Sequence, residues 1–183
     1  MQWTLIRLQR WEMELCFALA RLQHLRLSKL LFVTVSRLGD GVLWYALMAA
    51  LLIVQGGAAI PAVVHMAATG VVGLLLYKLI KSSTRRLRPC ESDPQLVPAT
   101  PALDRYSFPS GHTLHAVAFT MLATAYFPAL TLWLVPVAIL IAASRVVLGL
   151  HYPTDVAAGA AMGGALAYAS LTSPIAALFA LVG

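Results

Sequence analysis

The groups best able to do chemistry in this 183-residue chain are a few charged and imidazole side chains in an otherwise apolar sequence. They are Lys81, Arg88, His112, Arg145, His151 and Asp155. Guanidinium groups present a planar fork of N–H donors that matches phosphate oxygens, and an ammonium adds a point charge. Two histidines can supply a nucleophile and a proton donor. These residue types therefore predict a site that binds an anion and performs nucleophilic and acid–base chemistry on it.

The stretch 109–112 has the residues expected where a helix begins beside an anion. The backbone amides of Ser110, Gly111 and His112 would lie in the first turn. Amides there lack partners within the helix and can point at a bound anion. Gly111 has no side chain, so the backbone can come close to a ligand. We therefore expect this helix start to form one wall of the anion site.

Two sequence spacings predict which side chains act together. Lys81 and Arg88 are seven positions apart and share a helix face if the helix runs that far, since Pro89 must end it. Asp155 follows His151 by four positions, which is within reach of the imidazole across a helix start. A carboxylate on Nδ1 would fix the tautomer and stabilise the imidazolium. The attacking atom would then be Nε2 of His151.

The composition indicates that most of the surface faces lipid. Hydrophobic residues make up 60% of the chain and charged residues only 11%, against about 25% charged in soluble domains. A net charge of +6 favours anionic partners, but the basic residues form no run on a polar domain, so nucleic acid is not expected. Cys16 and Cys90 are expected to be free thiols, and the length suits one domain.

Apolar helices are predicted along most of the chain. A bilayer core needs about 20 apolar residues per helix. The predicted helical stretches are 30–35, 42–54, 59–80, 111–126, 130–150 and 153–182, with turns at 36–41, 55–57 and 127–128 and one long polar segment at 81–107. Gly159, Gly163 and Gly164 on the last helix are expected to permit close helix packing. The fold class is therefore all-α, an integral membrane bundle of about five to six transmembrane helices.

The first 29 residues form a separate unit in this interpretation. Residues 1–29 combine a helical repeat of leucines with a charged face and carry Trp3 and Trp11 near the start. This pattern favours an amphipathic helix that lies in the membrane interface, although a weakly apolar spanning helix fits the same residues. Charges persist too far for a cleavable signal peptide. Residues 30–183 make up the transmembrane domain.

The expected topology brings the functional side chains to one membrane face. The helix 59–80 ends at Lys81, the next begins at His112, the third ends near Arg145 and His151, and the last begins at Pro153. The turns on the opposite face carry no charge. Ionisable groups at membrane depth are costly and default to functional roles. The six residues can therefore converge by topology alone.

Here the sequence resembles the type 2 phosphatidic acid phosphatase superfamily. The three motifs that carry the resemblance are Lys81-x6-Arg88-Pro89, Pro109-Ser110-Gly111-His112 and Ser144-Arg145-x5-His151-x3-Asp155. They span less than half of the chain, but three spaced motifs in order are highly specific. The superfamily includes lipid phosphate and diphosphate phosphatases, glucose-6-phosphatases and vanadium haloperoxidases. Its membrane members are helical bundles, usually of six helices, and the charged first helix here departs from that pattern.

The resemblance implies a role for each matching residue. His151 is implied as the nucleophile that forms a phosphohistidine, Asp155 as its partner and His112 as the general acid. The implied phosphate cradle consists of Lys81, Arg88, Ser110, Gly111 and Arg145. The resemblance implies no cofactor and no metal, and the single carboxylate of the predicted cluster is too few for a hard metal ion.

The substrate remains open at the level of sequence. A site at the bilayer edge suits a lipid phosphate or diphosphate whose tail stays in the membrane, and phosphatidic acid, phosphatidylglycerol phosphate and undecaprenyl diphosphate are all candidates. One alternative is that undecaprenyl diphosphate alone is the substrate. A transporter with an anion site is an alternative of another class, but its ionisable groups would lie near the bilayer midplane. A haloperoxidase would be soluble and larger. The sequence does not determine the oligomeric state.

The location of the protein and the role of its remaining charged residues each have two interpretations. The resemblance implies a bacterial inner membrane with the site on the periplasmic face, whereas the positive-inside rule favours the cytoplasmic face. Arg85, Arg86 and Arg105 either steer anionic head groups or are solvated loop charges. Asp40 is expected to shape a loop near the active face, and His115 is a weak second candidate for an acid.

Overall fold

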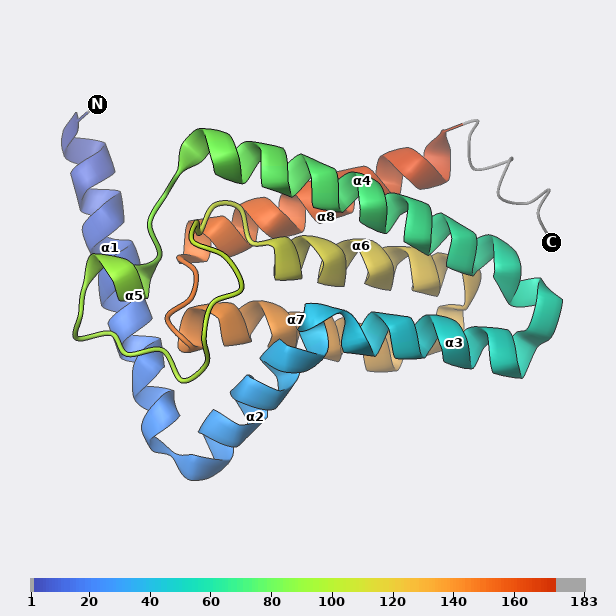
Figure 1. Ribbon diagram of the computed structural model, residues 1–183, viewed down its shortest axis with the longest axis horizontal. Coiled ribbons are helices and arrows are strands. Elements are labelled where there is room, and N and C mark those ends of the chain that lie inside the picture. The colour runs from blue at the N-terminus through green and yellow to red at the C-terminus, as the bar shows by residue number, and fades with distance from the viewer. Residues whose placement is uncertain (1, 174–183) are drawn as a thin grey trace.

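A computed structural model describes residues 2–173, and helices account for most of them (Figure 1). The main helices are α1 (Gln2–Ala20), α2 (Arg26–Arg37), α3 (Leu43–Gln55), α4 (Ile60–Thr84), α5 (Pro89–Ser92), α6 (Gly111–Tyr126), α7 (Thr131–Val147) and α8 (Pro153–Thr172). The predicted all-α class is confirmed. The helix predicted at 111–126 coincides with α6, and the end of the one predicted at 153–182 lies outside the described residues.

The bundle is built around α6, which packs against α4, α7 and α8. These helices and α3 run along the long axis of the molecule (Figure 1). The buried core between them is apolar and includes Trp44, Met66, Leu114, Leu122 and Ile141. Burial of such side chains contributes roughly 1.5–3 kcal/mol each in water. The polar groups lie outside this core, at the ends of the helices, where the candidate site is found.

Two glycines allow α8 to lie directly on the backbone of α6. A Cβ atom at Gly159 would come within 2.4 Å of the carbonyl oxygen of Ser110, and one at Gly163 within 2.2 Å of that of Leu114. The predicted close packing is confirmed at these two positions. It is wrong at Gly164, where the nearest atom to an added Cβ would be 3.8 Å away.

The junction between α2 and α3 is a kinked helix and not the predicted turn. Residues Leu38–Val42 continue the helix as one π-helical turn, and Gly41 absorbs the bend with a φ of 128°. The polar residues that suggested a turn have partners inside the fold. Ser36 accepts a hydrogen bond from Arg145, and Asp40 contacts His112. These polar contacts let a polar sequence remain helical.

Lys81 and Arg88 do not share a helix face, because α4 ends four residues before Arg88. Its last residue is Thr84, and Arg85 adopts a left-handed conformation with φ of 48°. Lys81 is therefore in the helix, whereas Arg88 lies in the segment that follows. The two side chains still converge, because the chain turns back toward the bundle after Arg85.

Helix α1 runs across one end of the bundle instead of along it (Figure 1). It packs against α7 and α8, and its Glu12 and Cys16 are buried. Elsewhere the outer surface is apolar, with exposed side chains that include Tyr45, Ile53, Leu75, Leu79, Leu132, Trp133 and Ile139. Within residues 2–173, two helical stretches are long and apolar enough to cross a membrane, Arg26–Thr84 and Pro128–Val147.

Candidate active site

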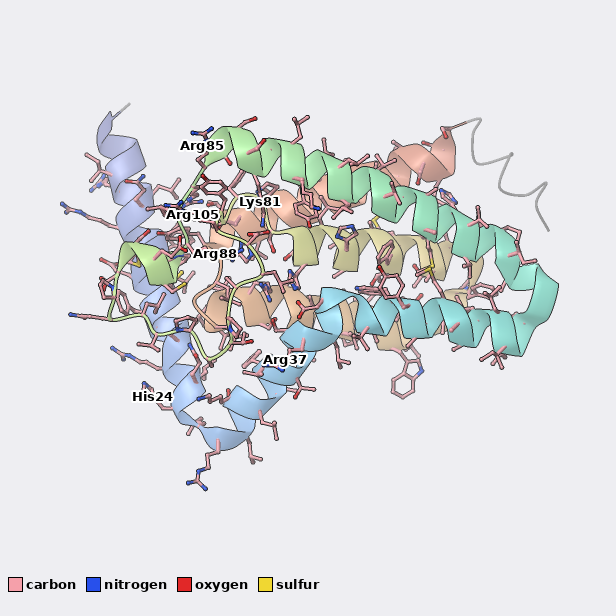
Figure 2. The ribbon with its side chains drawn as sticks, in the orientation of Figure 1. His24, Arg37, Lys81, Arg85, Arg88 and Arg105 are labelled. Atoms are coloured by element: carbon pink, nitrogen blue, oxygen red, sulfur yellow. The ribbon has the colours of Figure 1, made fainter. Side chains whose placement is uncertain are left out.

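A buried cationic cradle lies at the end of the bundle where α1 crosses it. Figure 2 shows Lys81 and Arg88 at that end. Lys81 donates to both carboxylate oxygens of Asp104, at 2.9 and 2.7 Å, and Arg88 Nη2 donates to Oδ1 at 2.5 Å. Arg88 Nε also donates to the carbonyl oxygen of Asp104. The two cations thus hold one pair of anionic oxygens, which is the arrangement needed to bind phosphate.

Asp104 is charged in this position. Burial alone would raise the pKa of its carboxyl, but the hydrogen bonds and charges of Lys81 and Arg88 outweigh burial and lower it. The carboxylate comes from the loop between α5 and α6. It therefore occupies the cradle as an internal anion paired with both cations.

His151 faces the same cradle from the loop between α7 and α8. The chain reverses there through Gly149, whose φ is 69°. Arg88 Nη1 lies 3.1 Å from Nε2 of His151 and also donates to the carbonyl oxygen of Leu150. Because arginine can only donate, Nε2 must be the acceptor, and the neutral ring carries its proton on Nδ1. The nitrogen with the free electron pair therefore faces the cations.

The surroundings of His151 favour its neutral form. The side chain is 1% exposed. Burial lowers the pKa of His151, and the charges of Arg145, Arg88 and Lys81 lower it further. A neutral imidazole is the form that can attack phosphorus.

Asp155 lies beside the other ring nitrogen of His151. Its Oδ2 is 3.6 Å from Nδ1, which is longer than a hydrogen bond, and among the described residues Nδ1 has no hydrogen-bond partner. Oδ2 instead accepts from the backbone amide of Tyr152 at 2.8 Å, and Oδ1 accepts from Arg86 at 2.7 Å. The carboxylate is thus held in place next to the imidazole without closing on it.

His112 projects from the first turn of α6 and contacts Asp40 of the α2–α3 junction. Its Nε2 forms a short contact with the Asp40 carboxylate. Asp40 was expected only to shape a loop. The Asp40 carboxylate fixes the orientation of the His112 ring.

The start of α6 offers fewer free amides than the sequence suggested. The Ser110 amide donates to the carbonyl oxygen of Asp155 at 3.0 Å, and the Ser110 hydroxyl caps the helix at Thr113. The amides of Gly111 and His112 remain for an anion. The Ser110 amide therefore joins α6 to α8 and is not available to an anion.

Arg145 completes the cationic group from the last turn of α7. It is buried, and Nη1 forms a short contact with Ser36 Oγ, whereas Nε has no hydrogen-bond partner within residues 2–173. A buried guanidinium N–H without an acceptor is costly, and a bound anion would satisfy it.

An apolar cavity of about 340 Å³ opens beside these groups. Lys81, Arg88, Asp104, His112 and His151 line its polar end. The rest of its wall is mainly apolar and comes from α3, α4 and α6, with Trp44, Met48, Val71, Leu74, Tyr77 and Phe119. An anionic head group at the polar end would leave the apolar part for a hydrocarbon chain.

Sequence reasoning missed two acidic residues around the site, Glu12 and Asp104, and gave Asp40 and Arg86 other roles. Asp40, Arg86 and Asp104 contact predicted site residues, and Glu12 contacts Arg86. They come from four separate segments, and no local pattern marks their partners. The ring nitrogens of His115 lie 2.9 and 3.1 Å from the backbone carbonyl oxygens of Gly111 and Gly70, so this histidine has a structural environment. No group of three His, Cys, Asp or Glu side chains that could hold a metal ion occurs in the described part of the chain.

The fold and the site define an all-helical protein with a buried anion site at one end of its bundle. The model of the PAP2 superfamily matches residues 58–177, about two thirds of the chain. The chain belongs to the PAP2 superfamily.

Several curated proteins are similar in sequence. Decaprenylphosphoryl-5-phosphoribose phosphatase of Mycolicibacterium smegmatis is 42% identical over 44% of this chain and 43% of its own length. Lipid A 1-phosphatase of Rhizobium etli is 36% identical over 55% of this chain and 45% of its own. Undecaprenyl-diphosphatase of Sulfolobus acidocaldarius is 30% identical over 79% of this chain and 72% of its own. The chain thus spans less than half the length of the first two.

Two solved structures share the fold. The transmembrane PAP2 type phosphatidylglycerolphosphate phosphatase of Bacillus subtilis has a TM-score of 0.72 and 22% identity, over 90% of this chain and 84% of that chain. LpxE of Aquifex aeolicus has a TM-score of 0.67 and 22% identity, over 85% of this chain and 93% of that chain. At this identity the similarity establishes the fold alone.

Proposed function

We propose that this protein is an integral membrane phosphatase that removes phosphate from a lipid through a phosphohistidine on Nε2 of His151. One observation carries the proposal. The buried, neutral imidazole presents Nε2 to the cations that already hold the Asp104 carboxylate. A phosphate in the place of that carboxylate would put phosphorus in front of the nucleophile.

The first chemical step uses both histidines. The electron pair on Nε2 of His151 forms an N–P bond while the P–O bond to the lipid breaks, and His112 gives its proton to the leaving oxygen. Lys81, Arg88 and Arg145 stabilise the charge on the phosphoryl oxygens, with the amides of Gly111 and His112. Asp155 stabilises the His151 ring as it becomes positively charged.

The second step releases phosphate. A water molecule attacks phosphorus, the P–N bond breaks, and the electron pair returns to Nε2 of His151. His112, which lost its proton in the first step, takes one from the water. Inorganic phosphate then leaves the cradle, and the protein returns to its starting state. No step draws on a cofactor.

The cavity and the relatives both favour a lipid substrate. The apolar wall beside the charged groups suits a hydrocarbon chain. The curated relatives are named as phosphatases of decaprenylphosphoryl-5-phosphoribose, lipid A and undecaprenyl diphosphate. We propose a lipid phosphate or diphosphate as the substrate class, with phosphatidic acid, phosphatidylglycerol phosphate and undecaprenyl diphosphate as candidates. A transporter is not supported, because the named relatives are phosphatases.

The proposed membrane arrangement follows from the distribution of charge. Residues 41–77 and 113–144 contain no Asp, Glu, Lys or Arg, and their helices expose apolar side chains. We propose a bundle of about five to six spanning helices, with α1 in the interface across the charged end. The proposed location is a bacterial inner membrane with that end on the periplasmic face.

Phosphate release from lipids in detergent micelles tests the reaction. The assay offers the three candidate lipids with EDTA present, and His151→Ala serves as the control. We expect release by the wild type and none by the variant, because the N–P bond cannot form. Equal release by the variant contradicts the proposal. The order of the rates ranks the substrates.

A further inference from the structure

Arg86 lies between two buried carboxylates and outside the anion cavity. Its Nη1 donates to Asp155 Oδ1 at 2.7 Å, and its Nη2 donates to Glu12 Oε2 at 2.6 Å. The guanidinium lies over the ring of Tyr152, 4.0 Å from its centre. The side chain is partly buried and does not line the cavity that holds the cradle. Its charge is directed at carboxylates and not at a substrate.

Glu12 anchors this contact from α1. Its side chain is 1% exposed, which is costly for a carboxylate unless every oxygen is paired. Oε2 accepts from Arg86, and Oε1 accepts from the amide of Thr154 at 3.1 Å and from the Thr154 hydroxyl. Arg86 Nη1 donates to the same hydroxyl at 2.8 Å. Glu12, Arg86 and Thr154 thus form one closed network at the start of α8.

Asp155 is held at both carboxylate oxygens, one of them by this network. Oδ1 is held by Arg86 and Oδ2 by the Tyr152 amide, so the carboxylate cannot rotate away from His151. Nδ1 of His151 carries the ring proton and has no hydrogen-bond partner within residues 2–173, with Oδ2 3.6 Å away. A movement of less than 1 Å closes that gap to hydrogen-bond distance.

We propose that Arg86, held by Glu12 of α1, is a positioning residue that aims Asp155 at the imidazole of His151. This inference rests on the proposed function. It makes α1 part of the catalytic apparatus, since the helix supplies the carboxylate that holds the arginine. Steering of anionic head groups is one of the two roles considered for Arg86. It does not explain the contacts of this guanidinium, because two carboxylates already share its charge.

The first test compares neighbouring arginines. Arg86→Gln and Arg85→Gln remove the same charge one residue apart, but Arg85 is exposed, and its side chain donates to the carbonyl oxygen of Ser82 at the end of α4. We expect Arg86→Gln to lower kcat by about 10- to 100-fold, as loss of outer partners does at metal-bound histidines, with little change in KM. Arg85→Gln should leave kcat unchanged. A change in KM alone, of similar size in both variants, would show steering and overturn the inference.

A double-mutant cycle shows whether Arg86 acts through Asp155. If it does, Arg86→Gln adds little to the loss already caused by Asp155→Asn, because the carboxylate that it orients is gone. Losses that multiply would overturn the inference. An Asp155→Asn variant with full kcat would instead contradict the proposed function, so the two failures are distinguishable.

Two further variants separate positioning from folding. Glu12→Gln should lower kcat in the same direction as Arg86→Gln, and Arg86→Lys should recover part of the loss because an ammonium can still pair with Asp155. Vanadate binding reports on the cradle, which Arg86 does not touch. Unchanged vanadate affinity in Arg86→Gln with a lowered kcat supports positioning, whereas vanadate affinity lost in parallel with kcat shows a collapsed site and overturns it.

Discussion

At the scale of single residues, the site depends on keeping one histidine neutral among cations. Arg88 donates to Nε2 of His151, and burial with the charges of Arg145, Arg88 and Lys81 lowers the pKa of His151. The same cations that would bind phosphate therefore also keep the nucleophile unprotonated. Removal of one of them would affect both binding and the protonation state of the ring.

This lowered pKa predicts the acidic limb of the pH–rate profile. Protonation of His151 removes the electron pair that attacks phosphorus, so activity falls as the pH drops through the pKa of the ring. Because that pKa lies below the ordinary value of 6.5, we expect the limb below pH 6.5. The measurement is kcat against pH for two substrates whose phosphates ionise at different pH values. A shared limb above pH 6.5 would count against a neutral His151.

Much of the site could be predicted at this scale, because its residues belong to three compact motifs. The spacing of His151 and Asp155 placed the carboxylate beside the ring. Sequence could not show that Oδ2 is already taken by the Tyr152 amide, which leaves the 3.6 Å gap. Asp104 lies 23 positions along the chain from its partner Lys81, and Glu12 lies 74 positions from its partner Arg86. Only the folded chain brings such partners together.

At the scale of elements, the loop between α5 and α6 would compete with the substrate of the proposed reaction. It delivers the Asp104 carboxylate to Lys81 and Arg88, where phosphate oxygens would bind. The proposed substrate would have to displace this carboxylate before it reached the cations. The loop would therefore weaken the binding of every anion that uses the cradle.

Asp104→Asn should accordingly bind vanadate more tightly. The carboxylate is partly exposed, so its ion pairs contribute about 1 kcal/mol, and the inhibition constant should fall by about 3- to 10-fold. Glu91→Gln is the matched control, since Glu91 is an exposed acid of the preceding helix α5. Inhibition of the hydrolysis assay by vanadate gives both constants. Weaker inhibition of Asp104→Asn than of the wild type would mean that Asp104 supports the cradle instead of competing for it.

The close contact between α8 and α6 leads to a second prediction at this scale. Gly163→Ala would drive a Cβ to 2.2 Å from the Leu114 carbonyl oxygen, and such overpacking costs about 1–3 kcal/mol. Gly164→Ala, one residue on, meets no atom closer than 3.8 Å and gains helix propensity. Thermal unfolding in detergent should therefore show a lower Tm for Gly163→Ala only. Equal Tm values would mean that the two helices separate at no cost.

Element boundaries were predicted best where the chain is apolar and worst where polar side chains find partners inside. The span 111–126 matches α6, whereas the turn expected at 36–41 is helical. Ser36 and Asp40 looked like loop residues, but they contact Arg145 and His112. A polar residue that serves a buried site has the same local signature as one that faces water.

At the scale of the whole molecule, all the charge lies at one end of an apolar bundle. The basic residues labelled in Figure 2 are at this end, as are α1 and α5. The opposite end, at Gly56–Ala59 and Pro128–Leu130, carries no charged side chain. In the proposed membrane arrangement, the two ends of the bundle lie on opposite sides of the bilayer.

Cysteine labelling of cells tests that orientation. In a background of Cys16→Ser and Cys90→Ser, one cysteine is placed at the charged end as Glu91→Cys and another at the opposite end as Gly57→Cys, both at exposed positions. A thiol reagent that cannot cross the inner membrane should label Glu91→Cys and leave Gly57→Cys unlabelled. The reverse pattern would place the site on the cytoplasmic face.

The position of the site at one end of the bundle has a consequence for the supply of lipid substrate. A lipid in the far leaflet keeps its head group about 30 Å away, across the hydrocarbon core, and no charged group of the bundle extends there. Under the proposed function, the protein would therefore dephosphorylate only lipids of the near leaflet. It would leave the lipid product in that leaflet and release phosphate into the adjoining water. In a cell, its turnover would then be limited by the transfer of fresh lipid from one leaflet to the other.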